Sequence, residues 1–431
     1  MRLAVAIFLG KVIAYLSRQF KIGGGSAAPG LFALRIDPEL VEGLSKRIPQ
    51  NVVITGTNGK TTTARMLAHF AKESGLKVIR NHTGSNLERG VASTLITHAR
   101  RPLTKLNYDL GIWELDEAAF NSVAPKLRPN IVVFLNVFRD QLDRYGEVDT
   151  VVKNWCQTLK NLAKDTMVLA NGDDVNTSKL AQCFAGKVQK FGVKDYKIIG
   201  EALEHQKTSG PHDFEAKNVK LNGLTSSSFK ITFSNSNDRH ELKVKLPLPG
   251  VYHVYNALAA IACVFNLNLP THRLTETLKH FQPAFGRVEK LPFGYIFLIK
   301  NPAGATQVFE TIAPQIKKND RLLLALNDNL ADGTDISWIW DGDFERLTIN
   351  DERLTIICSG TRAYDLAVRL KYAGFNPKNL IVQEELQNAL KQAKKDLEGT
   401  LFILPTYTAM LKLQSILAKS GIKKNYWEED N

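Results

Sequence analysis

A run of small and polar residues is the part of this sequence best suited to chemistry on phosphate groups. The run consists of Gly56, Thr57, Asn58, Gly59, Lys60, Thr61, Thr62 and Thr63. It follows the apolar segment 51–55 and precedes the helix-favouring segment 64–68, an order that predicts strand, loop and helix. Backbone N–H groups of such a loop can surround phosphate oxygens, Lys60 can neutralise them, and the hydroxyl of Thr61 can hold Mg²⁺. These residues therefore predict an enzyme that uses ATP or GTP.

The spacing of the glycines differs from the general phosphate-loop pattern, which has a longer stretch between them. Only Thr57 and Asn58 separate Gly56 from Gly59. A glycine-rich turn that merely caps a helix is the alternative, although a cap does not need the Lys-Thr-Thr that follows. Other parts of the sequence must therefore support the assignment.

Acidic residues follow an apolar segment at 110–114. Glu114 closes that segment, and Asp116 and Glu117 come shortly after it. A carboxylate at the end of a strand beside a phosphate loop suits Mg²⁺. The alternative is a solvated acidic loop, because acidic residues are common on protein surfaces.

Two further polar clusters follow apolar segments. Residues 136–143 offer metal or phosphate ligands, or else Asp140 simply caps a helix. Residues 171–174 (Asn-Gly-Asp-Asp) fit either a turn or a contact with adenine or ribose, and the spacing alone does not separate the two.

The arrangement of apolar segments predicts an α/β protein with more than one domain. Short apolar runs alternate with helical patterns up to about residue 170, which is typical of a mainly parallel sheet covered by helices. Residues 194–245 change to an alternating, Ser- and Thr-rich pattern that predicts an antiparallel patch. A second α/β series begins near residue 291, and its helix from about Ala363 should end at Gly374. We therefore predict an N-terminal helix and Gly-rich segment at 1–45, domains at 46–290 and 291–431, and a ligand cleft between the two domains.

Composition narrows the classes of partner. The 431 residues carry a formal net charge of +13, which favours acidic ligands, but without a long basic run we expect no nucleic-acid partner. The first residues predict an amphipathic helix that can rest on a membrane surface, rather than a cleaved signal peptide. The four cysteines are widely spaced and lack any C-x-x-C pair, which argues against a zinc ribbon or a disulfide framework. We therefore expect free buried thiols and a cytoplasmic protein.

Taken together, these segments resemble the Mur ligase family, the ATP-dependent enzymes that form amide bonds in peptidoglycan and folate metabolism. The matching parts are 56–63, Glu114, 136–143, 171–174, 250–257 and 286–289. The resemblance implies a central ATP-binding domain with a mainly parallel sheet and a C-terminal Rossmann-like α/β domain. It also implies that Lys60 holds phosphates, that Thr61 and Glu114 hold Mg²⁺, that Asn256 and Asp173 lie on the adenine side, and that Arg287 contacts the nucleotide. Family members usually have His where Gln141 stands, so no metal contact is carried over to that position.

The second half resembles the MurT family, the synthetase subunits of lipid II isoglutaminyl synthase. The matching segments are 300–304, 327–341 and 359–365, and the likeness reaches the glycines at 23–25. The resemblance implies ATP-dependent amidation of the D-glutamate α-carboxylate in the lipid II stem peptide. Some members carry a four-cysteine zinc ribbon, but residues 194–245 contain no cysteine, so we predict no zinc.

Release of ammonia from glutamine needs an activated thiolate, and none of the four cysteines lies in a typical nucleophile turn. A separate glutaminase subunit of the GatD type should therefore supply the ammonia. In MurT proteins an aspartate of the second domain completes the Cys-His pair of that partner, and here it would be Asp335 or, as the alternative, Asp341. Both aspartates could instead cap a helix beside core tryptophans. A stand-alone Mur-type or folylpolyglutamate-type amino-acid ligase is the alternative function.

Overall fold

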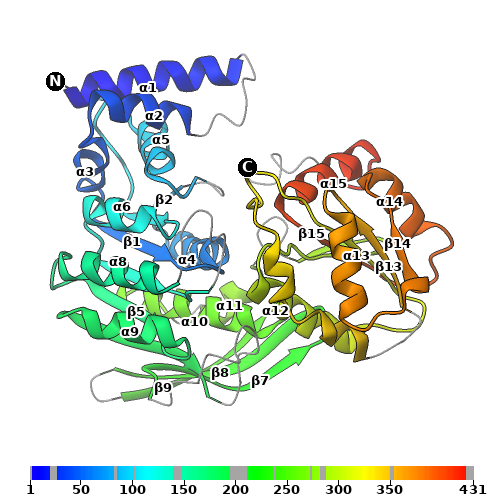
Figure 1. Ribbon diagram of the computed structural model, residues 1–431. Helices are drawn as coiled ribbons and strands as arrows, with labels where there is room; N and C mark the ends of the chain where they lie inside the picture. The colour runs from blue at the N-terminus through cyan, green and yellow to red at the C-terminus, as the bar shows by residue number, and fades with distance from the viewer. Residues whose placement is uncertain are drawn as a thin grey trace.

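The computed structural model describes residues 2–19, 27–81, 85–100, 103–138, 148–194, 211–235, 238–271, 274–281, 288–349 and 354–423. Within these ranges the chain forms two sheets, each covered by helices on both faces (Figure 1). The α/β class predicted from the apolar segments is confirmed.

The first sheet has nine strands in the order β2-β3-β1-β4-β5-β6-β7-β8-β9. The strands are β1 (Gln50–Thr55), β2 (Val78–Arg80), β3 (Leu110–Glu114), β4 (Ile131–Phe134), β5 (Met167–Asn171), β6 (Lys187–Val193), β7 (Phe214–Asn222), β8 (Ser226–Asn235) and β9 (Asp238–Leu246). Pairing is parallel from β2 to β7 and antiparallel from β7 to β9. The antiparallel patch expected within 194–245 thus extends the edge of the main sheet.

Helices cover this sheet in two layers because its central strands are apolar on both faces. One face packs against α4 (Lys60–Glu73), α10 (Val251–Asn266) and α11 (Leu274–Lys279). The other packs against α5 (Glu88–His98), α6 (Ala119–Leu127), α8 (Val148–Lys160) and α9 (Val175–Cys183), with α1 (Arg2–Gln19), α2 (Ala28–Ile36) and α3 (Leu40–Ser45) beyond them. No helix in the described part of the chain combines the length and apolarity needed to cross a bilayer.

The second sheet has six strands in the order β10-β11-β15-β12-β13-β14. They are β10 (Glu289–Leu291), β11 (Gly294–Ile296), β12 (Arg321–Ala325), β13 (Thr355–Ser359), β14 (Leu380–Val382) and β15 (Leu401–Pro405). Only the edge pair β10–β11 is antiparallel among these strands. The sheet begins at Glu289, close to the domain boundary predicted at 290, and that boundary stays a prediction.

Helices also cover both faces of the second sheet. They are α12 (Pro302–Ile312) and α13 (Ala363–Tyr372) on one face and α14 (Leu386–Lys394) and α15 (Tyr407–Lys419) on the other. Short 3₁₀ segments complete this half: η1 (Ala313–Gln315), η2 (Ser337–Trp340), η3 (Phe344–Ile349) and η4 (Pro377–Asn379). Helix α13 ends as predicted, since Gly374 has a left-handed φ of 97° just beyond it.

The Pro29–Gly30 pair lies inside α2, where Gly30 allows a close approach to α5. A Cβ atom on Gly30 would be 1.9 Å from the carbonyl oxygen of Arg89 in α5. The N–H of Gly30 donates to the hydroxyl of Ser93 at 2.8 Å. The glycines at 23–25 lie outside the described residues.

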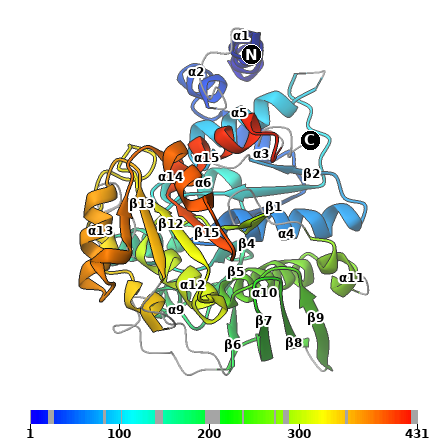
Figure 2. The ribbon, with the colours of Figure 1, turned by 90° about the vertical axis from the view of Figure 1, so that its right-hand side faces the viewer.

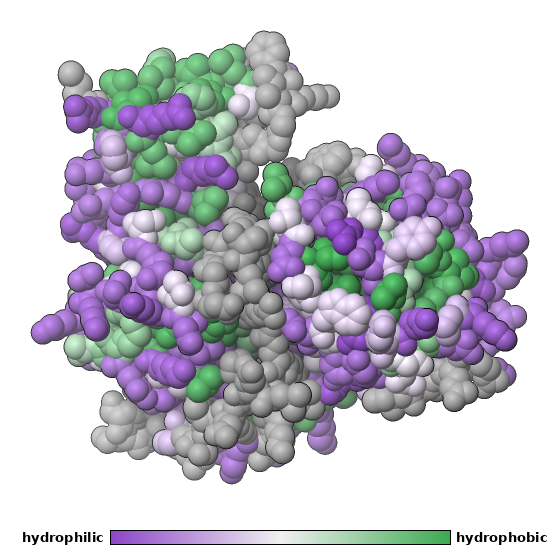
Figure 3. All heavy atoms as spheres, in the orientation of Figure 1, coloured by the Kyte–Doolittle hydropathy of each residue, from purple (hydrophilic) through white to green (hydrophobic). Residues whose placement is uncertain are grey.

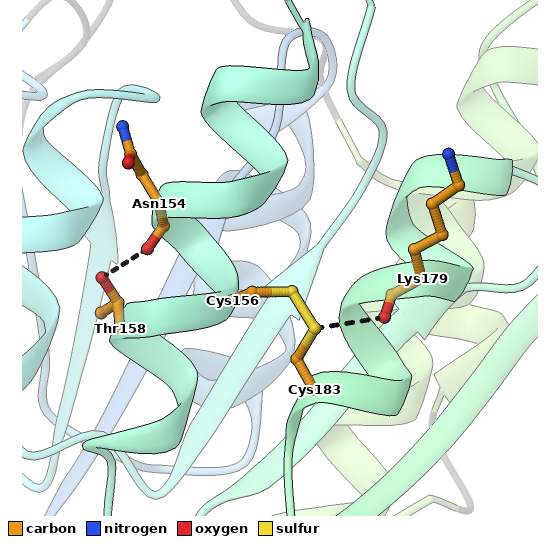
Figure 4. The surroundings of a disulfide bond; sticks show 5 residues. All are labelled: Asn154, Cys156, Thr158, Lys179 and Cys183. Atoms are coloured by element: carbon orange, nitrogen blue, oxygen red, sulfur yellow. Dashed lines mark hydrogen bonds between the residues drawn. A yellow bond between two sulfur atoms is a disulfide. The ribbon is translucent and has the colours of Figure 1, made fainter.

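The cysteine prediction is wrong for one pair. Cys156 of α8 and Cys183 of α9 form a disulfide, with Cα atoms 5.3 Å apart (Figure 4). The two helices pack side by side on the same face of the sheet, a proximity that the sequence separation of 27 does not reveal. Cys263 and Cys358 are free and buried, as predicted.

The carboxylate of Asp173 joins three parts of the first half. Its Oδ2 accepts hydrogen bonds from the Val193 N–H and the Tyr255 hydroxyl, both at 2.7 Å, and its Oδ1 lies 3.2 Å from His212 Nε2. Burial raises the pKa of this carboxyl, but hydrogen bonds from His212, Val193 and Tyr255 outweigh burial and hold the pKa below its ordinary value. The ionised carboxylate therefore stabilises the fold.

Replacing Asp173 with Asn should lower the free energy of unfolding at neutral pH by about 1–3 kcal/mol, because buried donors lose their charged acceptor. A carboxyl with a lowered pKa stabilises the native state above its unfolded-state pKa, and the contribution disappears as pH falls through the native pKa. Urea unfolding at neutral pH and at about pH 3 should thus show the gap between wild type and Asp173→Asn closing in acid. Asp165→Asn, at an exposed position, is the matched control. A gap that stays constant with pH would contradict the assignment.

Candidate active site at the phosphate loop

The phosphate loop lies between the end of β1 and the start of α4, as the sequence predicts. Gly56 and Gly59 have φ values of 137° and 93°, a region that favours glycine. A Cβ atom on Gly56 would be 2.9 Å from the carbonyl oxygen of Asn136, and one on Gly59 would be 2.2 Å from Oδ1 of Asn256. Both glycines are therefore required by backbone conformation and by close neighbours.

The two predicted Mg²⁺ ligands lie together. The hydroxyl of Thr61, in the first turn of α4, donates a hydrogen bond to Oε2 of Glu114, at the end of β3, at 2.6 Å. Asn81 holds the backbone of Glu114 on both sides, accepting from its N–H at 2.9 Å and donating to its carbonyl at 2.8 Å. Arg80 lies 3.6 Å from the other carboxylate oxygen. The glutamate is therefore fixed with its carboxylate beside the first turn of α4.

The ammonium group of Lys60 contacts the backbone of the phosphate loop and one nearby carboxylate. It donates hydrogen bonds to the carbonyl oxygens of Gly56 and Thr57, the latter at 3.3 Å, and its Nζ lies 3.7 Å from Oε2 of Glu117. Glu117 thus pairs with the lysine of the loop, whereas Asp116 accepts from the Ala119 N–H at 2.7 Å and caps α6. Among Glu114, Asp116 and Glu117, the hydrogen bond to Thr61 is made by Glu114, the last residue of β3.

A pocket opens beside the loop, between the two sheets. Residues of the first half line it at the loop, at the ends of β4 and β5, and on α10: Asn58, Gly59, Thr62, Leu135, Asn136, Phe138, Asn171, Tyr252, His253, Tyr255 and Asn256. Residues of the second half close it: Leu298, Lys300, Gly304, Gln307 and Val308. This is the predicted cleft, and the predicted residue Asn256 lies in its wall.

Two observations, one at the pocket and one beside it, fit a nucleotide with Mg²⁺. The Thr62 hydroxyl is buried at the first turn of α4 without a hydrogen-bond partner among the described residues, at the position where a phosphate would accept. Thr61 and Glu114 are only two side chains, and no group of three His, Cys, Asp or Glu residues in the described chain could hold a metal alone. Mg²⁺ suits such a site because it commonly combines one or two protein ligands with water and phosphate oxygens.

Not every predicted residue reaches the pocket. Asp173 is absent from the lining and instead holds Tyr255, which is part of it. Asn136 and Phe138 lie at the pocket, but residues 139–143, with Asp140 and Gln141, are outside the described residues, as is Arg287.

The sequence reasoning gave no role to a pair of amides that joins the two halves. Asn58 Nδ2 donates to Asn301 Oδ1 at 3.2 Å, and Asn301 Nδ2 donates back to Asn58 Oδ1 at 3.1 Å. Asn301 also caps α12, accepting from the Gly304 N–H at 2.8 Å. The Asn-Pro pair at 301–302 was the available signal, since Asn before Pro is typical of a helix start.

Asp335 and Asp341 lie at the two ends of η2, and both are exposed. Asp335 accepts from the Ser337 N–H at 2.8 Å, just before η2, whose N-cap residue is Ile336. The buried guanidinium of Arg369 fixes this segment by donating to the carbonyl oxygens of Ile339 and Gly342, each at 2.9 Å. Trp340 is 51% exposed, so it does not fill the core.

The free thiols are unsuited to nucleophilic chemistry. Burial raises the pKa of Cys358 to about 12 and raises that of Cys263 further. Cys156 and Cys183 are bonded to each other. A thiolate at neutral pH is therefore not available from these four cysteines.

Comparison with known families matches both halves of the chain. Residues 54–264 match the Mur ligase middle domain, and residues 298–410 match the MurT ligase C-terminal family. Solved structures of the same fold include MurF from Acinetobacter baumannii, with a TM-score of 0.68, 17% identity and coverage of 91% of this chain and 80% of that one. Folylpolyglutamate synthase from Mycobacterium tuberculosis, complexed with ADP and AMPPCP, has a TM-score of 0.61, 15% identity and coverage of 88% and 92%.

Curated relatives match nearly the whole chain. The MurT subunit of the glutamine-hydrolysing lipid II isoglutaminyl synthase from Streptococcus pneumoniae is 30% identical over 436 residues, which cover 93% of this chain and 94% of the relative. The corresponding MurT subunit from Staphylococcus aureus strain COL is 29% identical over 448 residues, covering 97% and 99%. The chain therefore belongs to the MurT family of Mur ligases.

Proposed function

We propose that this protein is the synthetase subunit of a lipid II isoglutaminyl synthase. It converts the α-carboxylate of D-glutamate in the lipid II stem peptide into the amide of D-isoglutamine, using ATP and ammonia. The observation that carries the proposal is the pairing of a complete phosphate loop, with Thr61 and Glu114 2.6 Å apart, and a second half that matches the MurT C-terminal family.

The reaction proceeds in two steps, transfer of a phosphoryl group and attack by ammonia. An oxygen of the glutamate α-carboxylate attacks the γ-phosphorus of ATP, the bond to the β,γ-bridging oxygen breaks, and ADP leaves. Ammonia then attacks the carbonyl carbon of the acyl phosphate, loses a proton, and expels inorganic phosphate. The protein's task in the first step is to position phosphates and to stabilise their charge.

The loop residues from Gly56 to Thr62 would hold the phosphates by their N–H and hydroxyl groups, with Lys60 as the cation. Thr61 and Glu114 would hold Mg²⁺, which neutralises the charge that develops on the transferred phosphoryl group. Asn256 would face the adenine side, and Asp173 would act there through Tyr255, which it holds by a hydrogen bond. The contact of Arg287 with the nucleotide stays a prediction.

Ammonia would come from a glutaminase partner of the GatD type, because this chain supplies no accessible thiolate among its four cysteines. An exposed surface on α13, which packs against η2, supports the docking of such a partner. Tyr364, Val368 and Tyr372 are exposed along one face of α13, and the Tyr372 ring meets Trp340 at a centroid distance of 5.7 Å. Exposed aromatic clusters of this kind mark protein interfaces. We place the complex in the cytoplasm, where ATP and glutamine are available.

Purification of the chain alone and with a co-expressed GatD-type glutaminase tests the proposal. The pair should amidate lipid II with glutamine and ATP, whereas the chain alone should require added ammonia. The measurements are ADP release and the mass of the stem peptide. Ligation of a free amino acid by the chain alone would instead establish the stand-alone ligase.

Lys60→Ala should reduce both glutamine-driven and ammonia-driven amidation by at least about a hundredfold, because the phosphates lose their cation in a partly buried site. Steady-state kinetics with each nitrogen source provide the measurement. Lys72→Ala, at an exposed position of the same helix, should leave both rates within about twofold of wild type. A folded Lys60→Ala protein that retains either rate would refute the role of this lysine.

Asp335→Asn should abolish glutamine-driven activity and spare ammonia-driven activity. A neutral amide cannot stabilise a partner's imidazolium, although it can still accept from the Ser337 N–H. The same two assays on Asp341→Asn decide between the two aspartates. Loss of ammonia-driven activity in Asp335→Asn, with an unchanged circular dichroism spectrum, would sink the assignment to the partner's site.

A further inference from the structure

One face of α1 is apolar and exposed along its length. Its residues recur at helical spacing: Val5, Phe8, Leu9, Val12, Tyr15 and Leu16. Neighbouring α2 adds Leu31 and Phe32. These residues are eight of the fourteen large hydrophobic side chains found exposed in the described part of the chain, so they form a patch and are not scattered. We refer to them as the α1–α2 face.

The opposite side of α1 is fixed to the protein. Ala6 and Ile7 are fully buried against the helices below, and a Cβ atom on Gly10 would lie 3.0 Å from the Ile96 side chain. The ammonium group of Lys11 donates to the carbonyl oxygen of Ala99. The apolar face therefore points outward from a helix that is firmly packed.

The location of the α1–α2 face suits contact with an extended surface. In two views at right angles, α1 and α2 form the outermost layer at one end of the molecule (Figures 1 and 2). The space-filling view shows hydrophobic surface gathered over these helices, above the mainly hydrophilic flank of the first sheet (Figure 3). The 18 residues of α1 span about 27 Å, and the helix is not apolar enough to cross a bilayer.

The charge of the residues around the α1–α2 face indicates which kind of partner it binds. Residues 1–36 contain no aspartate or glutamate and five basic residues, Arg2, Lys11, Arg18, Lys21 and Arg35, of which Lys11 is used in the packing against Ala99. Arg35 lies at the face itself, with its guanidinium carbon 5.6 Å from the centre of the Phe32 ring. A second copy of the chain would bring cations opposite cations in a two-fold interface, which is unfavourable. An anionic lipid surface satisfies both the apolar side chains and the charge.

We propose that the α1–α2 face binds the surface of an anionic membrane, with α1 lying in the plane of the interface and its apolar side chains between the lipid headgroups. The surface is separate from the nucleotide pocket, so the proposal does not require the amidation reaction. If the acceptor is lipid-linked, as the proposed function holds, the same contact keeps the enzyme beside its substrate.

Flotation with vesicles tests this proposal on the full chain. Wild type should float with vesicles of phosphatidylglycerol and phosphatidylcholine in roughly equal amounts and much less with pure phosphatidylcholine, and salt should weaken the binding. The double variant Phe8→Gln, Leu16→Gln keeps helix-compatible residues and the net charge. It should reduce the partition coefficient by roughly tenfold to a hundredfold. Leu221→Gln, at an exposed apolar position of β7, is the matched control and should bind like wild type.

Nucleotide binding, measured by calorimetry with an ATP analogue, should be the same in all three proteins and shows that each is folded. Failure of wild type to float with the anionic vesicles would overturn the proposal, as would equal flotation of the double variant. A wild-type dimer that the double variant converts to a monomer, without vesicle binding by either, would assign the face to self-association instead. Vesicle binding with no lipid II amidation would leave this proposal standing and refute the proposed function.

Discussion

The site depends on how closely the phosphate loop approaches its neighbours at Gly59. There the backbone has a left-handed φ, and the carboxamide of Asn256 occupies the space that a Cβ atom would need. Helix α10 is buried along most of its length and packs against α4, so Asn256 cannot retreat without disturbing the core. This contact fixes the start of α4, and with it the positions of Lys60, Thr61 and Thr62. The chemistry of the loop thus rests on a steric constraint and not on a flexible glycine-rich turn.

The same loop connects the two halves of the molecule. Asn58 exchanges two hydrogen bonds with Asn301, which also caps α12. Helix α12 supplies Gly304 and Gln307 to the pocket, and Lys300 precedes it. The phosphate loop and the start of α12 are therefore held together by a reciprocal pair of side-chain hydrogen bonds. The pocket is complete only because both halves contribute to it.

The sequence predicted the fold well because both sheets are mainly parallel and covered on two faces. Such strands need nearly continuous apolar runs, and runs such as 131–135 are easily distinguished from the polar segments between them. The phosphate loop, Glu114 and the end of α13 at Gly374 could also be located, because each depends on the types of residue next to it in the sequence.

Pairings between side chains that are distant in the sequence could not be predicted. Nothing in the order of residues reveals that Cys156 lies beside Cys183, or that Asn58 meets Asn301 across 243 positions. Asp173 illustrates the same limit, because its position after β5 suggested a ligand contact while its oxygens are used by Val193, Tyr255 and His212. These contacts depend on how the layers pack, and the local pattern contains no information about that packing.

The exposed apolar surfaces can be related to the two chemical tasks of the proposed reaction, which are activation of a carboxylate and release of ammonia. Activating a carboxylate requires bound phosphates, a metal ion and a pocket that excludes water. The pocket at the junction of the two sheets lies beside Thr62, and the proposal assigns the metal to Thr61 and Glu114. Releasing ammonia requires a thiolate, and burial makes ionisation of Cys263 and Cys358 unfavourable. This is consistent with the proposal that a partner supplies the ammonia. Exposed apolar side chains are unfavourable unless another surface covers them. The aromatic side chains on α13 lie beside the aspartates of η2, whereas the α1–α2 face lies at a different end of the molecule (Figure 1). Because the two surfaces share no residues, the proposed partner and the proposed membrane contact would not compete for the same site.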